Sequence, residues 1–95
     1  NISPILLYWI LLKVKIRVFG TGDCKDCKLL LNALNSKNIS YSFVDALSPD
    51  TQEFCDKHNV NRLPHVQVID ARGKITYEKI GRVTNEDFEK ITASL

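Results

Sequence analysis

The 95-residue sequence contains no methionine, a single tryptophan, three prolines and only four glycines. This shortage of proline and glycine excludes collagen-like and low-complexity chains, and a hydrophobic share of 44% is that of an ordinary globular domain. Long hydrophobic runs are also missing, because the longest, at residues 2–12, is shorter than the ~20 residues that a membrane-spanning helix needs. At this length the chain has room for one domain with one hydrophobic core.

The sequence also lacks an excess of one charge sign. Thirteen Lys and Arg against eleven Asp and Glu leave a formal net charge of +2, and the basic residues are scattered rather than gathered into a stripe. Nucleic-acid binding therefore has no electrostatic support. Three cysteines are an odd number, so a framework of paired structural disulfides cannot use them all. We expect a monomer in the reducing cytoplasm.

Residues 1–12 form an apolar segment that we place outside the core fold, with the folded domain at residues 13–95. A secretory signal would need a basic start and a small-residue cleavage site, and neither is visible. One alternative is the end of a membrane anchor followed by cytoplasmic Lys13, Lys15 and Arg17. Others are an extra strand or helix packed on the domain, or translated sequence outside the mature fold.

The remaining chain predicts the order β-α-β-α-β-β-α. Segments in which apolar residues alternate every two residues indicate strands, and segments in which they recur every three or four residues indicate helices. The expected strands are residues 13–19, 40–44, 66–69 and 74–80, and the expected helices are residues 24–36, 48–58 and a last one from residue 84. Ser48 and the pair Thr84 and Asp87 fit the pattern of helix caps. A helical crossover joins the first two strands, so they should lie parallel, while the last two form a hairpin. We expect an α/β fold with a four-stranded mixed sheet flanked by helices.

Cys24 and Cys27 form a C-K-D-C motif at the predicted junction of strand and helix. A thiolate attacks a disulfide, and a second cysteine three residues on can resolve the mixed disulfide that results. The helix start stabilises a thiolate at Cys24, which we predict to be the nucleophile. Cys27 lies one turn into the helix on its apolar side, so we predict it to be the buried, resolving thiol.

Charged neighbours act on this pair in both directions. Lys25 and Lys28 favour a thiolate at Cys24, whereas Asp23 and Asp26 disfavour one. Our hypothesis is a Cys24 pKa below the free value of about 8.5, because the helix terminus acts in a fixed direction while charged side chains can turn into water.

Two other interpretations of the motif remain open. The first is a metal or iron–sulfur module in which the pair acts with Cys55, His65 or a partner subunit. The second is a non-catalytic adaptor that keeps only the fold. A position after a strand and at the start of a helix, within a β-α-β unit, favours redox chemistry. We therefore expect no metal ligands and no tightly bound cofactor.

From Lys13 to its end the chain resembles the thioredoxin superfamily, and glutaredoxins in particular. The resemblance rests on the V-F-G end of the first strand, the C-x-x-C motif, the Leu63–Pro64 dipeptide and Gly81 after the last strand. It implies a thioredoxin-like fold and a disulfide reductase that acts on protein disulfides or glutathione mixed disulfides by dithiol exchange. Glutathione, or a thioredoxin or glutaredoxin reductase, would be the electron donor.

The same resemblance implies a substrate site. Pro64 would be cis, and Leu63 and Pro64 would form a shelf whose backbone pairs with the bound peptide or glutathione. Lys25, Gly81 and Arg82 would complete the substrate-binding residues. The chain departs from the family in its C-K-D-C, which replaces the C-P-Y-C of glutaredoxins and the W-C-G-P-C of thioredoxins. It also has Gly-Arg-Val-Thr at residues 81–84, where glutaredoxins have an acidic residue that holds glutathione.

The remaining candidates have plainer interpretations. His65 could reach the cysteine pair, although strand alternation would equally point it to solvent. His58 is expected to be a cation at a helix end, and Cys55 to be a small buried hydrophobe. Arg62 could attract carboxylates beside the shelf, like Arg82. The aromatic residues expected in the core are Tyr41, Phe43, Phe54 and Phe88.

Overall fold

The computed structural model describes residues 14–95, so the predicted N-terminal segment at residues 1–12 lies outside the described residues. The elements are β1 (Lys15–Gly20), α2 (Lys25–Ser36), β2 (Ser42–Asp45), a 3₁₀ turn (Pro49–Thr51), α3 (Gln52–Lys57), β3 (His65–Ile69), β4 (Ile75–Ile80) and α4 (Asn85–Thr92). This order confirms the predicted β-α-β-α-β-β-α sequence. The second helix differs from the prediction, because its first turn is 3₁₀ and its α-helical part has only six residues.

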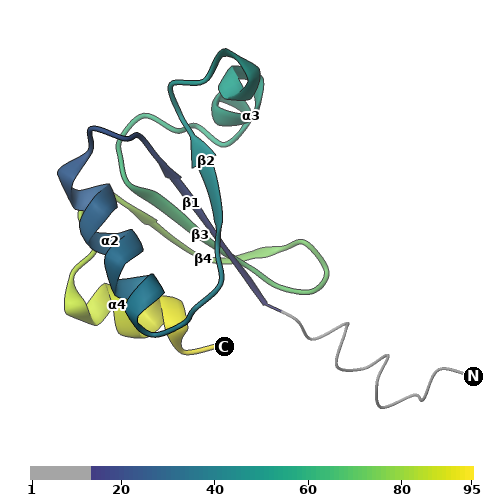
Figure 1. Cartoon of the computed structure of the whole chain (residues 1–95). Helices are drawn as coiled ribbons and strands as arrows, with labels where there is room; N and C mark the ends of the chain where they lie inside the picture. The colour runs from purple at the N-terminus through teal and green to yellow at the C-terminus, as the bar shows by residue number, and fades with distance from the viewer. Residues whose placement is uncertain (1–13) are drawn as a thin grey trace, which may run out of the picture.

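The four strands form one mixed sheet in the order β2-β1-β3-β4 (Figure 1). Strand β1 pairs in parallel with β2 and antiparallel with β3, and β3 pairs antiparallel with β4. The predicted α/β class and the mixed sheet are therefore confirmed. β2 and β4 are its edge strands, and β1 is central, which places the end of β1 in the interior of the fold.

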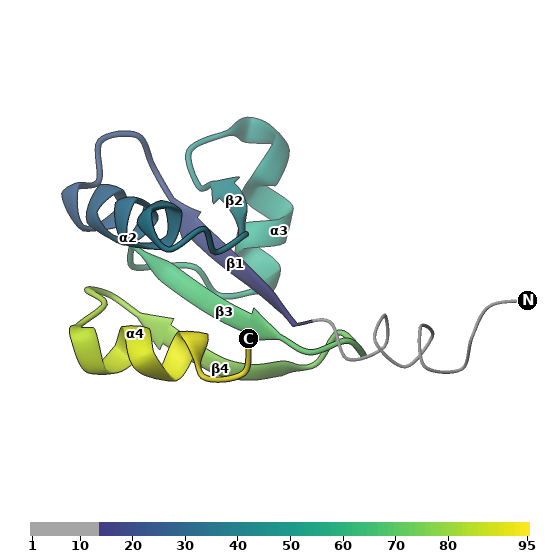
Figure 2. The same cartoon turned by 60° about the horizontal axis from the view of Figure 1, so that its bottom comes forward.

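The two faces of the sheet are covered unequally. Helices α2 and α4 pack together on one face, and the short α3 lies on the other (Figures 1 and 2). Alternation divides the strands accordingly, so that Val18 and Val66 face α2 and α4. The main core lies on this side and contains Ile16, Val18, Leu30, Leu34, Val66, Val68 and Ile91.

Side chains fix the start of two helices. The Ser48 hydroxyl accepts a hydrogen bond from the Asp50 N–H, at 3.3 Å. Thr84 and Asp87 form a reciprocal capping box at the start of α4. Both predicted caps are confirmed, since each satisfies an N–H group that the helix itself leaves unpaired. Within residues 14–95, no helix combines the length and apolar character that crossing a membrane requires.

Candidate active site

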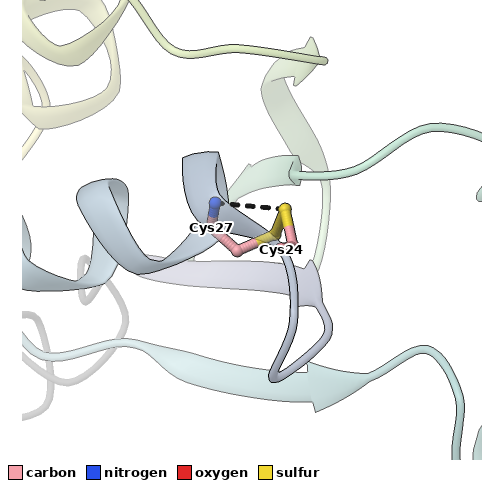
Figure 3. The surroundings of a disulfide bond; sticks show 2 residues. All are labelled: Cys24 and Cys27. Carbon is pink, nitrogen blue, oxygen red and sulfur yellow. Dashed lines mark hydrogen bonds between the residues drawn. A yellow bond between two sulfur atoms is a disulfide. The ribbon is translucent and has the colours of Figure 1, made fainter.

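Cys24 and Cys27 lie at the start of α2, after the loop that follows β1, and they form a disulfide (Figure 3). Their Cα atoms are 5.1 Å apart, within the range that a disulfide spans without backbone movement. Cys24 is half-buried, whereas Cys27 is fully buried. A substrate disulfide can therefore approach the sulfur of Cys24 but not that of Cys27.

Cys24 is the N-cap residue of α2, and its sulfur takes the place of a capping oxygen. The Sγ atom of Cys24 accepts a hydrogen bond from the backbone N–H of Cys27, at 3.2 Å (Figure 3). Unpaired N–H groups and the helix dipole both favour negative charge at this position. In the reduced protein the same N–H groups would face a Cys24 thiolate, and the lowered pKa of Cys24 stays a prediction.

Gly20, the last residue of β1, lets Cys27 approach the sheet. A Cβ atom at Gly20 would lie 2.9 Å from Cys27 Sγ and 3.1 Å from the Phe43 ring. Only a glycine therefore allows α2 to bring the buried sulfur against the backbone of β1. The V-F-G end of the strand is visible in the sequence. The need for glycine at residue 20 is not, because it depends on the contact with Cys27 across the fold.

Phe43 corrects one expectation about the core. Its side chain is 42% exposed rather than buried. The reason is that β2 is an edge strand, so its end is covered on fewer sides than β1. Phe43 instead gives the molecule an exposed aromatic surface beside Gly20 and Cys27.

The predicted shelf lies between the end of α3 and the start of β3. The Leu63–Pro64 peptide bond is cis, and the Pro64 carbonyl accepts a hydrogen bond from the Gly81 N–H at 2.8 Å. Gly81 has φ +92, a conformation that favours glycine, and the Arg62 side chain lies 3.6 Å from the place of its missing Cβ. Leu63 is half-buried and keeps part of its surface open.

The other two predicted binding residues are exposed. Lys25 is the first residue of α2, next to Cys24. Arg82 follows Gly81 and lines a groove that also reaches Asp26, the residue before Cys27. The chain thus brings the predicted shelf residues Pro64 and Gly81 together by a hydrogen bond, and their roles in binding stay predictions.

His65 lies away from both places that the sequence suggested. It is buried, and its Nε2 atom forms a hydrogen bond with the Glu78 carboxylate. Its ring packs 5.3 Å from that of Phe19, on the face of the sheet that α3 covers. Cys27 contacts the opposite face at Gly20, so the sheet separates this histidine from the cysteine pair. The expectation that His65 faces the pair or solvent is wrong.

His58 is not the cation at a helix end that the sequence predicts. Its Nδ1 atom lies 3.1 Å from the Gln67 amide nitrogen, which donates to it. Burial, followed by the charges of Arg17 and Lys57, holds the pKa of His58 below its ordinary value. A neutral ring is the form that can accept this hydrogen bond.

Gln67 joins the two histidines into one polar network on the α3 face. Its amide also donates to the Glu78 carboxylate at 2.9 Å, and its carbonyl accepts from Arg17 at 2.9 Å. The hydrogen bonds from Gln67 and His65 lower the pKa of Glu78. The network satisfies a buried glutamine, which would otherwise destabilise the fold.

We expect this network to make the protein less stable in acid. The folded-state pKa values of His58 and Glu78 lie below their ordinary values of 6.5 and 4.5. The unfolded chain therefore binds protons first, so stability begins to be lost as the pH falls below 6.5, for His58, and below 4.5, for Glu78, and the loss continues down to their lower folded-state pKa values. Urea unfolding across this range measures the loss. His58→Gln keeps a hydrogen-bonding side chain and should flatten the upper part of the curve. An unchanged curve in this variant would contradict the assignment.

Metal binding has no cluster of ligands to support it within residues 14–95. No group of three or more His, Cys, Asp or Glu side chains is arranged there so that it could hold a metal ion. Cys55 is a free, buried cysteine of α3. Its burial agrees with the interpretation as a small hydrophobe.

Comparison with known proteins gives a consistent result. The model of the thioredoxin domain family matches residues 14–92. Thioredoxin O1 from Arabidopsis thaliana is similar in structure, with a TM-score of 0.73 and 15% identity over 98% of this chain and 92% of that one. For thioredoxin O2 of the same plant the TM-score is 0.70 and the identity is 20%, over 98% of this chain and 89% of that one. For Schistosoma mansoni thioredoxin the TM-score is 0.69 and the identity is 22%, over 96% of this chain and 88% of that one. No curated protein matches the sequence.

The matched residues include the whole sheet and all the helices of the described part of the chain. They also include the cysteine pair, which has the distance and the helix-start position that thiol–disulfide exchange requires. The fold and the pair together fit a thiol–disulfide oxidoreductase. The chain belongs to the thioredoxin domain family.

Proposed function

We propose that this protein reduces protein disulfides through Cys24 and Cys27. The observation that carries the proposal is the unequal exposure of two bonded cysteines: Cys24 is half-buried at the helix start, and Cys27 is fully buried beside it. Such a pair can attack a substrate through one sulfur and resolve the product through the other.

The reaction balances within the pair and the substrate. The Cys24 thiolate attacks one sulfur of the substrate disulfide and expels the other as a thiolate, which takes a proton from water. Cys27 gives up its proton and attacks Cys24 Sγ, which expels the second substrate sulfur. The substrate gains two electrons and two protons, and the Cys24–Cys27 disulfide forms.

The shelf supports a polypeptide as the substrate. The Pro64 carbonyl is already paired with the Gly81 N–H, while Leu63 keeps an open surface before it. Pro64 and Gly81 are buried and hold the turn in place, so an extended substrate segment would pair with the backbone at the partly open Leu63. We therefore assign Leu63, Pro64 and Gly81 to the binding of the segment that carries the substrate disulfide.

For the electron donor, the start of α4 favours a protein reductase over glutathione. The Asp87 carboxylate accepts hydrogen bonds from the Thr84 N–H at 3.0 Å and from its hydroxyl at 2.9 Å. These bonds, with Lys79 nearby, lower the pKa of Asp87 to about 2. The Asp87 carboxylate is thus committed to the helix cap and to Lys79, so it does not replace the acidic residue that glutaredoxins use to hold glutathione and that residues 81–84 lack.

A comparison of donors tests this assignment. We expect insulin disulfides to be reduced with NADPH and a thioredoxin reductase, and glutathione with its own reductase to be slower by roughly tenfold, the effect of one missing charge contact. Thr84→Asp supplies an acidic residue in this stretch and keeps a capping side chain at the N-cap of α4. This variant should raise the glutathione-supported rate. Equal rates with the two donors in the unaltered protein would contradict the assignment.

A dithiol that must be reduced again after each turnover needs a reducing compartment. We propose the cytoplasm for this reason. We also propose that the protein acts as a monomer, because each chain contains both cysteines and the shelf.

A further inference from the structure

A groove of about 330 Å³ runs between α2 and the start of α4, beside the cysteine pair. We call it the α2–α4 groove. Residues of α2 form one wall, and Arg82, Val83 and Phe88 contribute to the other. The steps of dithiol exchange described above do not use this groove.

The wall on α2 is a single stripe of the helix. Asp26, Leu29, Ala33 and Lys37 follow one another at intervals of three and four residues, so they share one face. The stripe begins between the two cysteines and reaches the helix C-cap. At 1.5 Å per residue it covers about 16 Å, the length of about five residues of extended peptide.

The middle of the groove is apolar and open to solvent. Leu29 is 55% exposed, and Ala33, Val83 and Phe88 are half-buried along its walls. Ala33 and Phe88 both line the groove, and the small side chain of Ala33 leaves room there. Covering the exposed leucine with an apolar side chain of a bound molecule removes apolar surface from water and so stabilises the complex.

The groove has a basic residue near each end, and the acidic Asp26 also lines the end near the cysteines. Arg82 lies at the end near the cysteines and Lys37 at the far end, and both are exposed. Among residues 14–95, no salt bridge involves either of them. Both charges can therefore pair with an acidic residue or backbone carbonyls of a bound molecule.

Neighbouring residues of the chain link the groove to the shelf. Gly81 donates its N–H to Pro64 in the shelf, and the next residue, Arg82, lines the groove. A polypeptide held at the shelf with its disulfide at Cys24 therefore lies close to the groove, whose α2 wall begins at Asp26, the residue before Cys27.

We propose that the α2–α4 groove binds an extended segment of the partner protein whose disulfide is exchanged at Cys24. This segment places an apolar side chain against Leu29, Ala33 and Phe88, and an acidic residue near Lys37, about five residues from its cysteine. The proposal rests on the proposed function and names the class of partner: a disulfide protein with an apolar and acidic segment next to the reactive cysteine.

Synthetic peptides provide the test. Each has one cysteine, joined as a mixed disulfide to nitrothiobenzoate, whose release gives a colour. The leucine–glutamate peptide has these two residues at the stated spacing. It is made in two versions, one with the residues before the cysteine and one with them after it. The comparison peptide has serine and lysine in their places. The small disulfide dithiobis-nitrobenzoate serves as a substrate that cannot reach the groove.

We expect kcat/KM to be roughly tenfold higher for one leucine–glutamate peptide, the effect of covering one apolar side chain. Ala33→Arg fills the groove and should remove this preference, while Asn32→Arg, on the exposed side of the same helix, should keep it. Lys37→Glu should favour lysine over glutamate in the peptide. None of these three variants should change the rate with dithiobis-nitrobenzoate.

Failure of the groove and failure of the proposed function look different. If the protein reduces dithiobis-nitrobenzoate but treats all peptides alike, the groove proposal is overturned and the reductase stands. If a preference emerges only after removal of residues 1–12, the chain's own segment occupies the groove and the proposal is also overturned. If no disulfide is reduced, the proposed function itself has failed.

Discussion

Cys24→Ser is expected to lose disulfide reduction completely, while Cys27→Ser is expected to stop after the first attack and remain joined to its substrate. The difference follows from position: Cys24 is accessible at the N-cap of α2, and Cys27 is buried and can reach only Cys24. A hydroxyl at residue 24 is a far weaker nucleophile than a thiolate, so the rate should fall to that of the uncatalysed exchange. Insulin reduction measures the loss, and intact mass spectrometry detects the trapped species.

Cys55→Ser is the matched control for these two variants. Its thiol is buried in α3 and takes no part in the disulfide, so turnover should stay close to that of the unaltered protein. A trapped mixed disulfide on Cys24→Ser rather than on Cys27→Ser would reverse the assigned roles. Full activity in Cys24→Ser would remove this cysteine from the mechanism.

Gly20→Ala is expected to destabilise the protein by about 1–3 kcal/mol, as other overpacked cores do. The added Cβ would lie 2.9 Å from Cys27 Sγ and 3.2 Å from Cys27 Cβ, so either α2 or the end of β1 has to move. Movement of Cys27 also slows the second step of exchange, because the two sulfurs must meet. Urea unfolding of the oxidised and reduced forms gives the stability, and release of product from the mixed disulfide gives the rate.

Gly22→Ala provides the comparison for this change. A Cβ atom at Gly22 meets nothing within 4 Å, although it lies only two residues further along the same loop. The free energy of unfolding should change by no more than about 0.5 kcal/mol. If Gly20→Ala were as stable and as active as Gly22→Ala, the close approach of Cys27 to β1 would not be needed for stability or for exchange.

The order of elements and the site of the disulfide could be predicted because both depend on local patterns. Alternation of apolar residues gives β1, helical spacing around Leu30 and Leu34 gives α2, and the Thr84–Asp87 pair gives the start of α4. These signals lie within one turn or one strand of the residues they specify. The position of Cys24 as an N-cap follows from the same local rule.

The errors arise where the outcome depends on contacts far along the chain. His65 is bonded to Glu78, thirteen residues away, and His58 to Gln67 on another element. No local pattern reveals which strand residues meet beneath a helix. Phe43 is exposed because β2 is an edge strand, and the order of strands is a property of the whole sheet. The role of Gly20 is likewise set by the packing of α2 on β1.

The central claim is that Cys24 and Cys27 form a reversible redox couple, and mass spectrometry of alkylated protein tests it most directly. The protein is equilibrated across glutathione redox buffers, its free thiols are alkylated, and the state of each cysteine is read from its peptides. The account predicts that Cys24 and Cys27 change together from two thiols to one disulfide as the buffer becomes more oxidising, while Cys55 stays reduced. If neither Cys24 nor Cys27 changes state across the range, the redox function is contradicted.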